Sequence, residues 1–162
     1  MKLIVFSDSH GVSRAMLEVM QLHPNADCFL HLGDGAPDFV NLCRTKGVPY
    51  AAVRGNCDFY NDLPNEMTLS FGDFTFYLTH GHICGAKYST YGLRERGQQA
   101  GADVVLYGHT HEPHLEYVSD EGDHPYYLFN PGSVKPGYGA LASYGVIEIK
   151  GKNLLLSHGK VL

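Results

Sequence analysis

The chain has no long hydrophobic segment. Its apolar runs, such as residues 3–6 and 104–107, are far shorter than the roughly 18 residues that a membrane-spanning helix needs. The first residues, one lysine and then a short apolar run, also fall short of the roughly 7–15 residue core of a signal peptide. We therefore expect a cytoplasmic protein with no membrane partner.

Basic residues are also scarce. The 162 residues include 12 Lys and Arg against 17 Asp and Glu, which gives a formal net charge of −5. Binding to an extended phosphate backbone normally requires an excess of basic residues. The composition therefore argues against extended nucleic acid as a partner.

Cysteine pairs and several common loop motifs are missing. The four cysteines stand at positions 28, 43, 57 and 84, so none form the C-x-x-C pair of zinc or redox sites. We expect reduced thiols, as in a cytoplasmic protein. The sequence also lacks the H-E-x-x-H pattern of zinc proteases and the G-x-G-x-x-G and G-x-x-x-x-G-K-[ST] nucleotide loops.

Short apolar runs alternate with helical patterns in the first part of the chain. Strands are expected at residues 2–6, 28–32 and 50–53, with helices between them near 15–22 and 38–46. Strands that alternate with helices are typical of an α/β fold.

The later part of the chain is richer in strands. Residues 67–71 and 74–79 flank Gly72-Asp73, which indicates a hairpin and does not fit an all-parallel sheet. The sheet should therefore be mixed. A further helix and five strands are expected at 89–100, 104–107, 115–118, 126–129, 144–149 and 154–157. No repeat or linker divides the chain, so we expect a single domain over residues 1–162.

Polar clusters directly follow six of the expected strands. They are Asp8-Ser9-His10, Gly33-Asp34, Gly55-Asn56, His80-Gly81-His82, Gly108-His109-Thr110-His111 and Asn130-Pro131-Gly132-Ser133. Ligand sites in open α/β sheets lie beyond the carboxyl ends of the strands. Each gap between the first five clusters holds about one strand and its return connection, so the clusters can converge on one face.

The side chains in these clusters have the chemistry of metal ligands. Two aspartates, one asparagine and several histidines form a mixed oxygen and nitrogen set, which suits divalent ions such as Mn, Fe, Co, Ni or Zn. Asp8 and His10, like His109 and His111, are two residues apart, so in extended backbone both side chains of a pair would project to the same side. So many ligands favour two metals, and two ions can clamp a phosphate for in-line displacement.

The ordered series of these motifs resembles the calcineurin-like metallophosphoesterase superfamily. Asn130-Pro131-Gly132-Ser133 resembles the small bacterial and archaeal phosphodiesterase branch of that superfamily. The resemblance implies a four-layer αββα sandwich, with two mixed β-sheets face to face and the helices outside. It also implies a dinuclear centre on the loops at one edge.

The resemblance further implies a role for each residue of the motifs. Asp34 would bridge the two ions. The terminal ligands would be Asp8, His10 and His111 on the first metal, and Asn56, His80 and His109 on the second. In the resembling enzymes a metal-bound water or hydroxide attacks phosphorus directly, without a covalent enzyme intermediate.

Each of three neighbouring residues is open to more than one interpretation. His82 could orient a ligand, contact substrate or donate a proton, or it could be structural. Arg54 matches an arginine that contacts phosphate in the protein-phosphatase members, although a solvated charge at a strand end is the alternative. Many members of the superfamily read G-N-H-[DE], with the histidine thought to protonate the leaving group. Here Cys57 takes that place, as in the small phosphodiesterase branch, which favours diesters.

The sequence therefore predicts a dinuclear, metal-dependent phosphodiesterase that acts on a small phosphodiester. We expect two divalent transition-metal ions, with Mn favoured and Fe, Ni, Co or Zn open, and Asp34, Asn56, His82 and Arg54 as the catalytic residues. The resemblance suggests a homo-oligomer. The alternatives are a phosphomonoesterase and a non-catalytic protein-interaction scaffold, as in the retromer subunit that resembles this superfamily. A scaffold, however, has no need to place seven costly polar groups at one edge.

Overall fold

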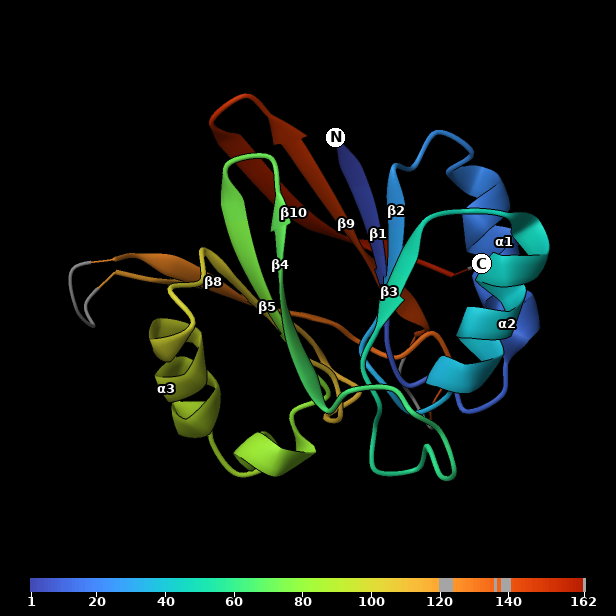
Figure 1. Ribbon diagram of the computed structural model, residues 1–162, viewed down its shortest axis with the longest axis horizontal. Coiled ribbons are helices and arrows are strands. Elements are labelled where there is room, and N and C mark those ends of the chain that lie inside the picture. The colour runs from blue at the N-terminus through green and yellow to red at the C-terminus, as the bar shows by residue number, and fades with distance from the viewer. Residues whose placement is uncertain (120–123, 136, 138–140, 162) are drawn as a thin grey trace.

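The computed structural model describes residues 1–119, 124–135, 137 and 141–161 (Figure 1). Its elements, in chain order, are β1 (Lys2–Phe6), α1 (Ser13–Leu22), β2 (Cys28–His31), α2 (Ala36–Lys46), β3 (Tyr50–Ala52), β4 (Glu66–Phe71), β5 (Phe74–Thr79), η1 (His82–Cys84), α3 (Tyr91–Gln99), β6 (Val104–Leu106), β7 (Pro113–Val118), β8 (Tyr126–Pro131), β9 (Ser143–Lys150) and β10 (Asn153–Lys160). The strands and α-helices expected from the sequence are all present, with small shifts at their ends.

The strands form two five-stranded sheets, and both are mixed. The first has the order β10-β9-β1-β2-β3, in which β1, β2 and β3 run parallel, β9 is antiparallel to β1, and β10 is antiparallel to β9. The second has the order β4-β5-β6-β8-β7, in which β5, β6 and β8 are parallel and the two edge strands are antiparallel. The predicted mixed character and the hairpin between β4 and β5 are confirmed.

The two sheets pack face to face, with helices on their outer sides. Alternate residues of β1 point to opposite faces. Leu3 and Val5 join a buried cluster with Phe76 of β5 and other residues of the second sheet, whereas Ile4 and Phe6 pack with α1 and α2. The outer face of the second sheet packs on α3 through a third cluster. The result is the predicted four-layer αββα sandwich.

The carboxyl ends of the parallel strands from both sheets meet at one edge. The loops that follow β3 and β5 lie at the lower edge of the view in Figure 1. Backbone hydrogen bonds join other loops of this edge, from Asp8 N to Gly33 O at 2.9 Å and from Gly108 N to His80 O at 3.1 Å. The polar clusters identified in the sequence therefore lie at the same edge of the two sheets.

Two further features complete the fold. The short 3-10 helix η1 was not expected. It lies between Gly81 and Gly85, whose φ angles of 100° and 67° are readily adopted only by glycine. Among the described residues, none of the helices is long and apolar enough to cross a membrane.

Candidate metal centre

The first group of donor atoms comes from the loops that follow β1 and β6. His111 Nε2 lies 3.1 Å from Asp8 Oδ1 and 3.4 Å from His10 Nε2. One donor atom from each of these three residues falls within 4.8 Å of the other two. This is the set that the sequence assigned to the first metal.

The second group comes from the loops that follow β3, β5 and β6. His80 Nε2 lies 3.2 Å from Asn56 Oδ1 and 3.2 Å from His109 Nδ1. The other nitrogen of His80, Nδ1, donates to Leu32 O at 2.7 Å, so Nε2 is the nitrogen that faces these neighbours. These are the three residues that the sequence assigned to the second metal.

Asp34 lies between the two groups. Its Oδ2 atom is 3.9 Å from His10 Nε2 and 3.5 Å from His80 Nε2. Its other oxygen, Oδ1, accepts a hydrogen bond from Cys57 N at 2.8 Å, which fixes the carboxylate. The Asp34 carboxylate therefore faces both groups, as does buried Asp8, whose Oδ1 is 3.9 Å from His80 Nε2, and the structure brings all seven of the predicted ligand residues together.

The backbone at these residues is left-handed rather than extended. Asp8, His10, Asp34, His109 and His111 have φ angles of 53°, 44°, 58°, 71° and 63°. The expectation that each pair converges by alternation along extended backbone is therefore wrong. The chain turns sharply at each strand end, and these side chains reach the same place by tight turns. Left-handed conformations of residues other than glycine carry strain and cluster at functional sites.

Asp58 fixes the loops that follow β2 and β3, although the sequence reasoning did not select it. Its carboxylate accepts hydrogen bonds from the backbone amides of Asp34 at 2.8 Å, Gly35 at 2.7 Å and Gly55 at 2.8 Å. Only 4% of the residue is exposed. The available indication was its position at the end of the Gly55-Asn56-Cys57-Asp58 motif. Its role is to hold Asp34 in place through the backbone.

The Asn130-Pro131-Gly132-Ser133 motif, at the end of β8, holds the loops of the site by hydrogen bonds rather than contributing donor atoms. Asn130 Nδ2 donates to Gly108 O at 3.1 Å and to Thr110 Oγ1 at 3.0 Å. Ser133 Oγ donates to Asp8 O at 2.9 Å. The motif therefore links the two loops that carry the first group of donors.

Glycines in the motifs are required by close approach. A Cβ atom on Gly55 would collide with the Asp34 carboxylate, and one on Gly108 would collide with Ser7 Oγ. Ser7 Oγ in turn donates to Asp8 Oδ2 at 2.6 Å. A side chain at either glycine would displace one of the two carboxylates.

The electrostatics of the site favour ionised carboxylates beside a neutral histidine. Burial raises the pKa of Asp34, but hydrogen bonds from His80 and Cys57 outweigh it, so this pKa is well below the usual range. The pKa of Asp8 is also lowered, because contacts with His111, His80 and Ser7 outweigh burial. For His109, burial and the positive charges of His80 and Lys87 lower the pKa to about 4. At neutral pH these groups therefore present lone pairs.

The residues have the chemistry of a cation site. Asp8 Oδ1 is buried and, within the described part of the chain, receives no well-directed hydrogen bond, although it faces His111. A buried carboxylate oxygen without a donor is costly unless a cation compensates it. A second carboxylate, Asp34, lies in the same group of donors as Asp8 and His80, and a cation between two carboxylates removes their repulsion.

Cys57 also lies at this centre. Its sulfur belongs to a third set of donors, with His10 and Asp34, whose atoms fall within 4.8 Å of one another. Asn56 Nδ2 donates to Cys57 Sγ at 3.4 Å. Burial and the negative charge of Asp34 raise the pKa of the thiol, so without a cation it stays protonated.

Arg54 and His82 lie beside the second group, with polar atoms that have no partner. Arg54 Nε and His82 Nδ1 are buried and make no hydrogen bond to the described residues. The His82 ring centre is 5.4 Å from that of His80 and 6.1 Å from that of His109. Burial and the charges of His80 and Arg54 lower the pKa of His82. Both side chains are therefore placed to meet a ligand at this edge.

His31 connects the loops that follow β1 and β2 through hydrogen bonds. It is fully buried. Its Nδ1 accepts from Gly33 N at 3.1 Å, so Nε2 carries the proton and donates to Ser9 Oγ at 3.0 Å. Burial lowers the pKa of His31 to about 4, which keeps the ring neutral at pH 7.

We expect His31 to make the metal-free protein sensitive to acid. Between pH 6.5 and about 4 the unfolded chain binds a proton at His31 that the folded chain does not. The free energy of unfolding should therefore decrease as pH falls, by up to about 1.4 kcal/mol per pH unit. Chemical denaturation across this range should show a shallower decrease in His31→Asn than in the wild type. A His124→Asn variant controls for the loss of an exposed histidine, and an unchanged slope in His31→Asn would contradict the assignment.

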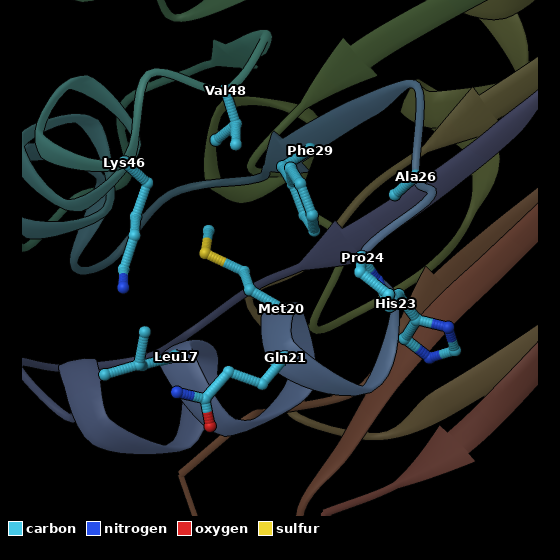
Figure 2. Close-up of a pocket in the computed structure, with 9 residues that line it drawn as sticks. All are labelled: Leu17, Met20, Gln21, His23, Pro24, Ala26, Phe29, Lys46 and Val48. Carbon is cyan, nitrogen blue, oxygen red and sulfur yellow. The ribbon is translucent and has the colours of Figure 1, made fainter.

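A separate hollow lies away from this centre. It encloses about 150 Å³ between α1, the start of β2 and the end of α2. Figure 2 shows Met20 between Leu17 and Phe29, with Lys46 and Val48 on the α2 side. The hollow lies near the amino ends of β2 and β3, opposite the loops described above. None of the predicted site residues lines this hollow.

Comparison with known proteins identifies relatives of the whole chain. A family model described as the calcineurin-like phosphoesterase superfamily domain matches residues 1–160. The probable metallophosphoesterase YsnB of Bacillus subtilis is 30% identical over 152 residues, which cover 93% of this chain and 85% of YsnB. The phosphodiesterase YfcE of Escherichia coli K12 is 32% identical over 176 aligned positions, which cover 91% of this chain and 88% of YfcE.

Solved structures show the same fold. A predicted phosphoesterase from Streptococcus pneumoniae superposes with a TM-score of 0.82 at 28% identity, covering 98% of this chain and 88% of that one. A double mutant of Vps29 from Entamoeba histolytica superposes with a TM-score of 0.81, covering 100% of this chain and 93% of that one. Its sequence identity is only 21%, so this likeness concerns the fold alone.

Proposed function

Because the chain belongs to the calcineurin-like phosphoesterase superfamily, we propose that it is a dinuclear, metal-dependent phosphodiesterase. The observation that carries the proposal is the position of Asp34. Its carboxylate faces His10 of one donor group at 3.9 Å and His80 of the other at 3.5 Å, which is the arrangement that a bridging ligand requires.

In this proposal each donor group holds one ion. Asp8, His10 and His111 hold the first, Asn56, His80 and His109 hold the second, and Asp34 contacts both. Two such ions, for which Mn²⁺ is our first choice, supply Lewis acidity that lowers the pKa of water and allows in-line displacement at phosphorus. Oxygen and imidazole donors also suit Fe, Co, Ni and Zn.

Arg54 and His82 each have a nitrogen atom without a hydrogen-bond partner, and a bound phosphate would supply one. The unpartnered Arg54 Nε and His82 Nδ1 atoms can each donate to a phosphate oxygen, and a guanidinium forms strong hydrogen bonds with such oxygens. The lowered pKa of His82 keeps its ring neutral, so that one nitrogen donates while the other accepts. We propose that Arg54 orients the phosphate and that His82 contacts it from the side of the second donor group.

Cys57 favours diesters over monoesters as substrates. A protonated thiol is a weak hydrogen-bond donor, and the raised pKa of Cys57 makes it a poor acid for a departing alkoxide. Substrates with good leaving groups depend less on such an acid. The relative YfcE is named a phosphodiesterase, in agreement with this preference, and a phosphomonoesterase is the alternative within the same family.

The test of the proposed function combines metal analysis with turnover. Purified protein loaded with Mn²⁺ should retain close to two ions per chain after desalting and should hydrolyse an aryl phosphodiester. Protein without metal and without turnover would instead support the scaffold alternative. Large side chains exposed near the centre, such as Phe59 and Tyr88 at 70% and 94%, could serve a protein partner in that case. The cytoplasmic location, the homo-oligomer and the single domain stay predictions.

Removal of the metal should lower both activity and stability. A ligand that binds only the folded state adds RT ln(1 + [L]/Kd) to the free energy of unfolding, which is about 2.7 kcal/mol when the ligand is at 100 times Kd. We therefore expect chelated protein to be inactive and to melt several degrees lower than protein with Mn²⁺. Scanning calorimetry with and without Mn²⁺ measures the difference, and a melting temperature that does not respond to Mn²⁺ would count against a preformed site.

A further inference from the structure

A hollow of about 500 Å³ lies beside the candidate metal centre. It lies between the segment that follows η1 and the loop from β6 to β7, and its polar lining residues are Lys87, Thr90, Tyr107, Thr110, Glu112 and His114. Thr110 stands between His109 and His111 in the chain, so one wall of the hollow is continuous with the donor groups. The volume falls in the range of roughly 300–1,000 Å³ that small-molecule sites occupy.

A hydrogen-bonded network beneath the hollow fixes its polar wall. Thr90 Oγ1 accepts from Arg94 Nε at 3.1 Å, and Arg94 Nη2 donates to Glu116 at 2.7 Å. His114 Nδ1 lies 2.7 Å from the Tyr107 hydroxyl. The wall is therefore preorganised before a ligand arrives.

The two threonine hydroxyls remain available as donors. Thr90 Oγ1 already accepts from Arg94. Thr110 Oγ1 accepts from Asn130 Nδ2 at 3.0 Å and from Glu112 N at 3.3 Å. A hydroxyl that accepts within the protein still has its own proton to donate. Both threonines can therefore donate to oxygen atoms of a ligand in the hollow.

Two opposite charges on the rim are also available. Within the described part of the chain, neither the Lys87 ammonium nor the Glu112 carboxylate makes a side-chain hydrogen bond or ion pair. Lys87 lies close enough to the centre for its charge to act on His109. Glu112 offers an acceptor to a ligand that has hydroxyl protons, and it would repel a second anion.

We propose that this hollow binds a neutral polyol, such as a glyceryl or sugar group, that is one of the two esters on the scissile phosphate. The inference rests on the proposed function and names its substrate class. Hydroxyls of a polyol both donate and accept, which matches one carboxylate, one ammonium and two threonine hydroxyls. Tyr107 is only 4% exposed, so it offers no open face on which a nucleobase could stack.

The experiment compares two esters that share one leaving group. p-Nitrophenyl glyceryl phosphate and p-nitrophenyl methyl phosphate differ only in the group that would enter the hollow. We expect the Mn²⁺-loaded protein to favour the glyceryl ester by roughly tenfold in kcat/KM, the effect of one added hydrogen bond to a charged group. Glu112→Gln should bring this ratio close to one. Glu95→Gln, an exposed change on α3, is the matched control.

The outcomes separate the two proposals. A ratio near one in the wild type, or a ratio that Glu112→Gln leaves unchanged, would overturn the polyol site while hydrolysis of both esters upholds the phosphodiesterase. If neither ester is hydrolysed, the proposed function fails. Amide NMR titration of the metal-free protein then tests whether the hollow binds the glyceryl group. Shifts at Lys87, Thr90 and Glu112 with the glyceryl ester alone would support the site. Their absence, or equal shifts with the methyl ester, would refute it.

Discussion

Replacement of Asp34 by asparagine is expected to abolish phosphoester hydrolysis more completely than the loss of any single terminal ligand. The Asp34 carboxylate faces both donor groups, so its loss disturbs both ions, whereas His10→Ala or His109→Ala disturbs one. Outer partners of metal ligands typically contribute 10–100-fold to metal affinity or activity, and we expect Asp34→Asn to exceed roughly 10³-fold in kcat/KM. Steady-state kinetics on an aryl diester, with the metal content of each variant, provide the measurement.

The matched control for this prediction is Asp73→Asn. Asp73 is an exposed aspartate in the turn between β4 and β5, at the opposite end of β5 from His80, and its replacement should leave kcat/KM unchanged. His158 is a poorer control because its Nε2 lies 2.7 Å from Asn130 O, in the motif that holds the loops of the site. Equal losses in Asp34→Asn and Asp73→Asn would contradict the assignment of Asp34 as the bridging ligand.

Replacement of Cys57 by histidine is expected to change which esters are hydrolysed. A histidine there could protonate an alkoxide leaving group, and general acid catalysis contributes typically 10²–10⁴-fold. We therefore expect Cys57→His to raise kcat/KM for an alkyl monoester relative to an aryl diester by roughly 10²-fold or more. Cys57→Ser, which adds no acid of suitable pKa, should leave that ratio nearly unchanged.

The position of Cys57 demands one further control. Its sulfur shares a set of donors with His10 and Asp34, so a substitution could alter metal binding rather than proton transfer. Metal content must therefore be equal in all three proteins before rates are compared. An unchanged ratio of monoester to diester turnover in fully metallated Cys57→His would refute our explanation of the diester preference, without affecting the ligand assignment.

The fold could be predicted from the sequence because its strands and helices follow simple patterns. The Gly72-Asp73 hairpin signalled a mixed sheet, and β1 alternates between the inter-sheet core and the helical layer. The short helix η1 escaped prediction because it depends on two glycines with positive φ rather than on hydrophobic periodicity.

The candidate site was only partly predictable. The residue types and their order after the strands indicated a metal site, and the resemblance to the superfamily implied the seven donor residues. The left-handed backbone at Asp8 and Asp34 could not be inferred from spacing, because aspartate adopts several turn conformations. Asp58 was missed for a related reason. It acts on backbone amides that are 3, 23 and 24 residues away, and side chain to backbone bonds of this kind leave no periodic pattern in a sequence.

The most direct test of the central claim is the anomalous scattering of a Mn²⁺-loaded crystal. Two peaks are expected, on opposite sides of the Asp34 carboxylate. One should be bound by Asp8, His10 and His111, and the other by Asn56, His80 and His109. A single peak bound by one group alone, or no peak among these residues in active protein, would contradict a dinuclear centre bridged by Asp34.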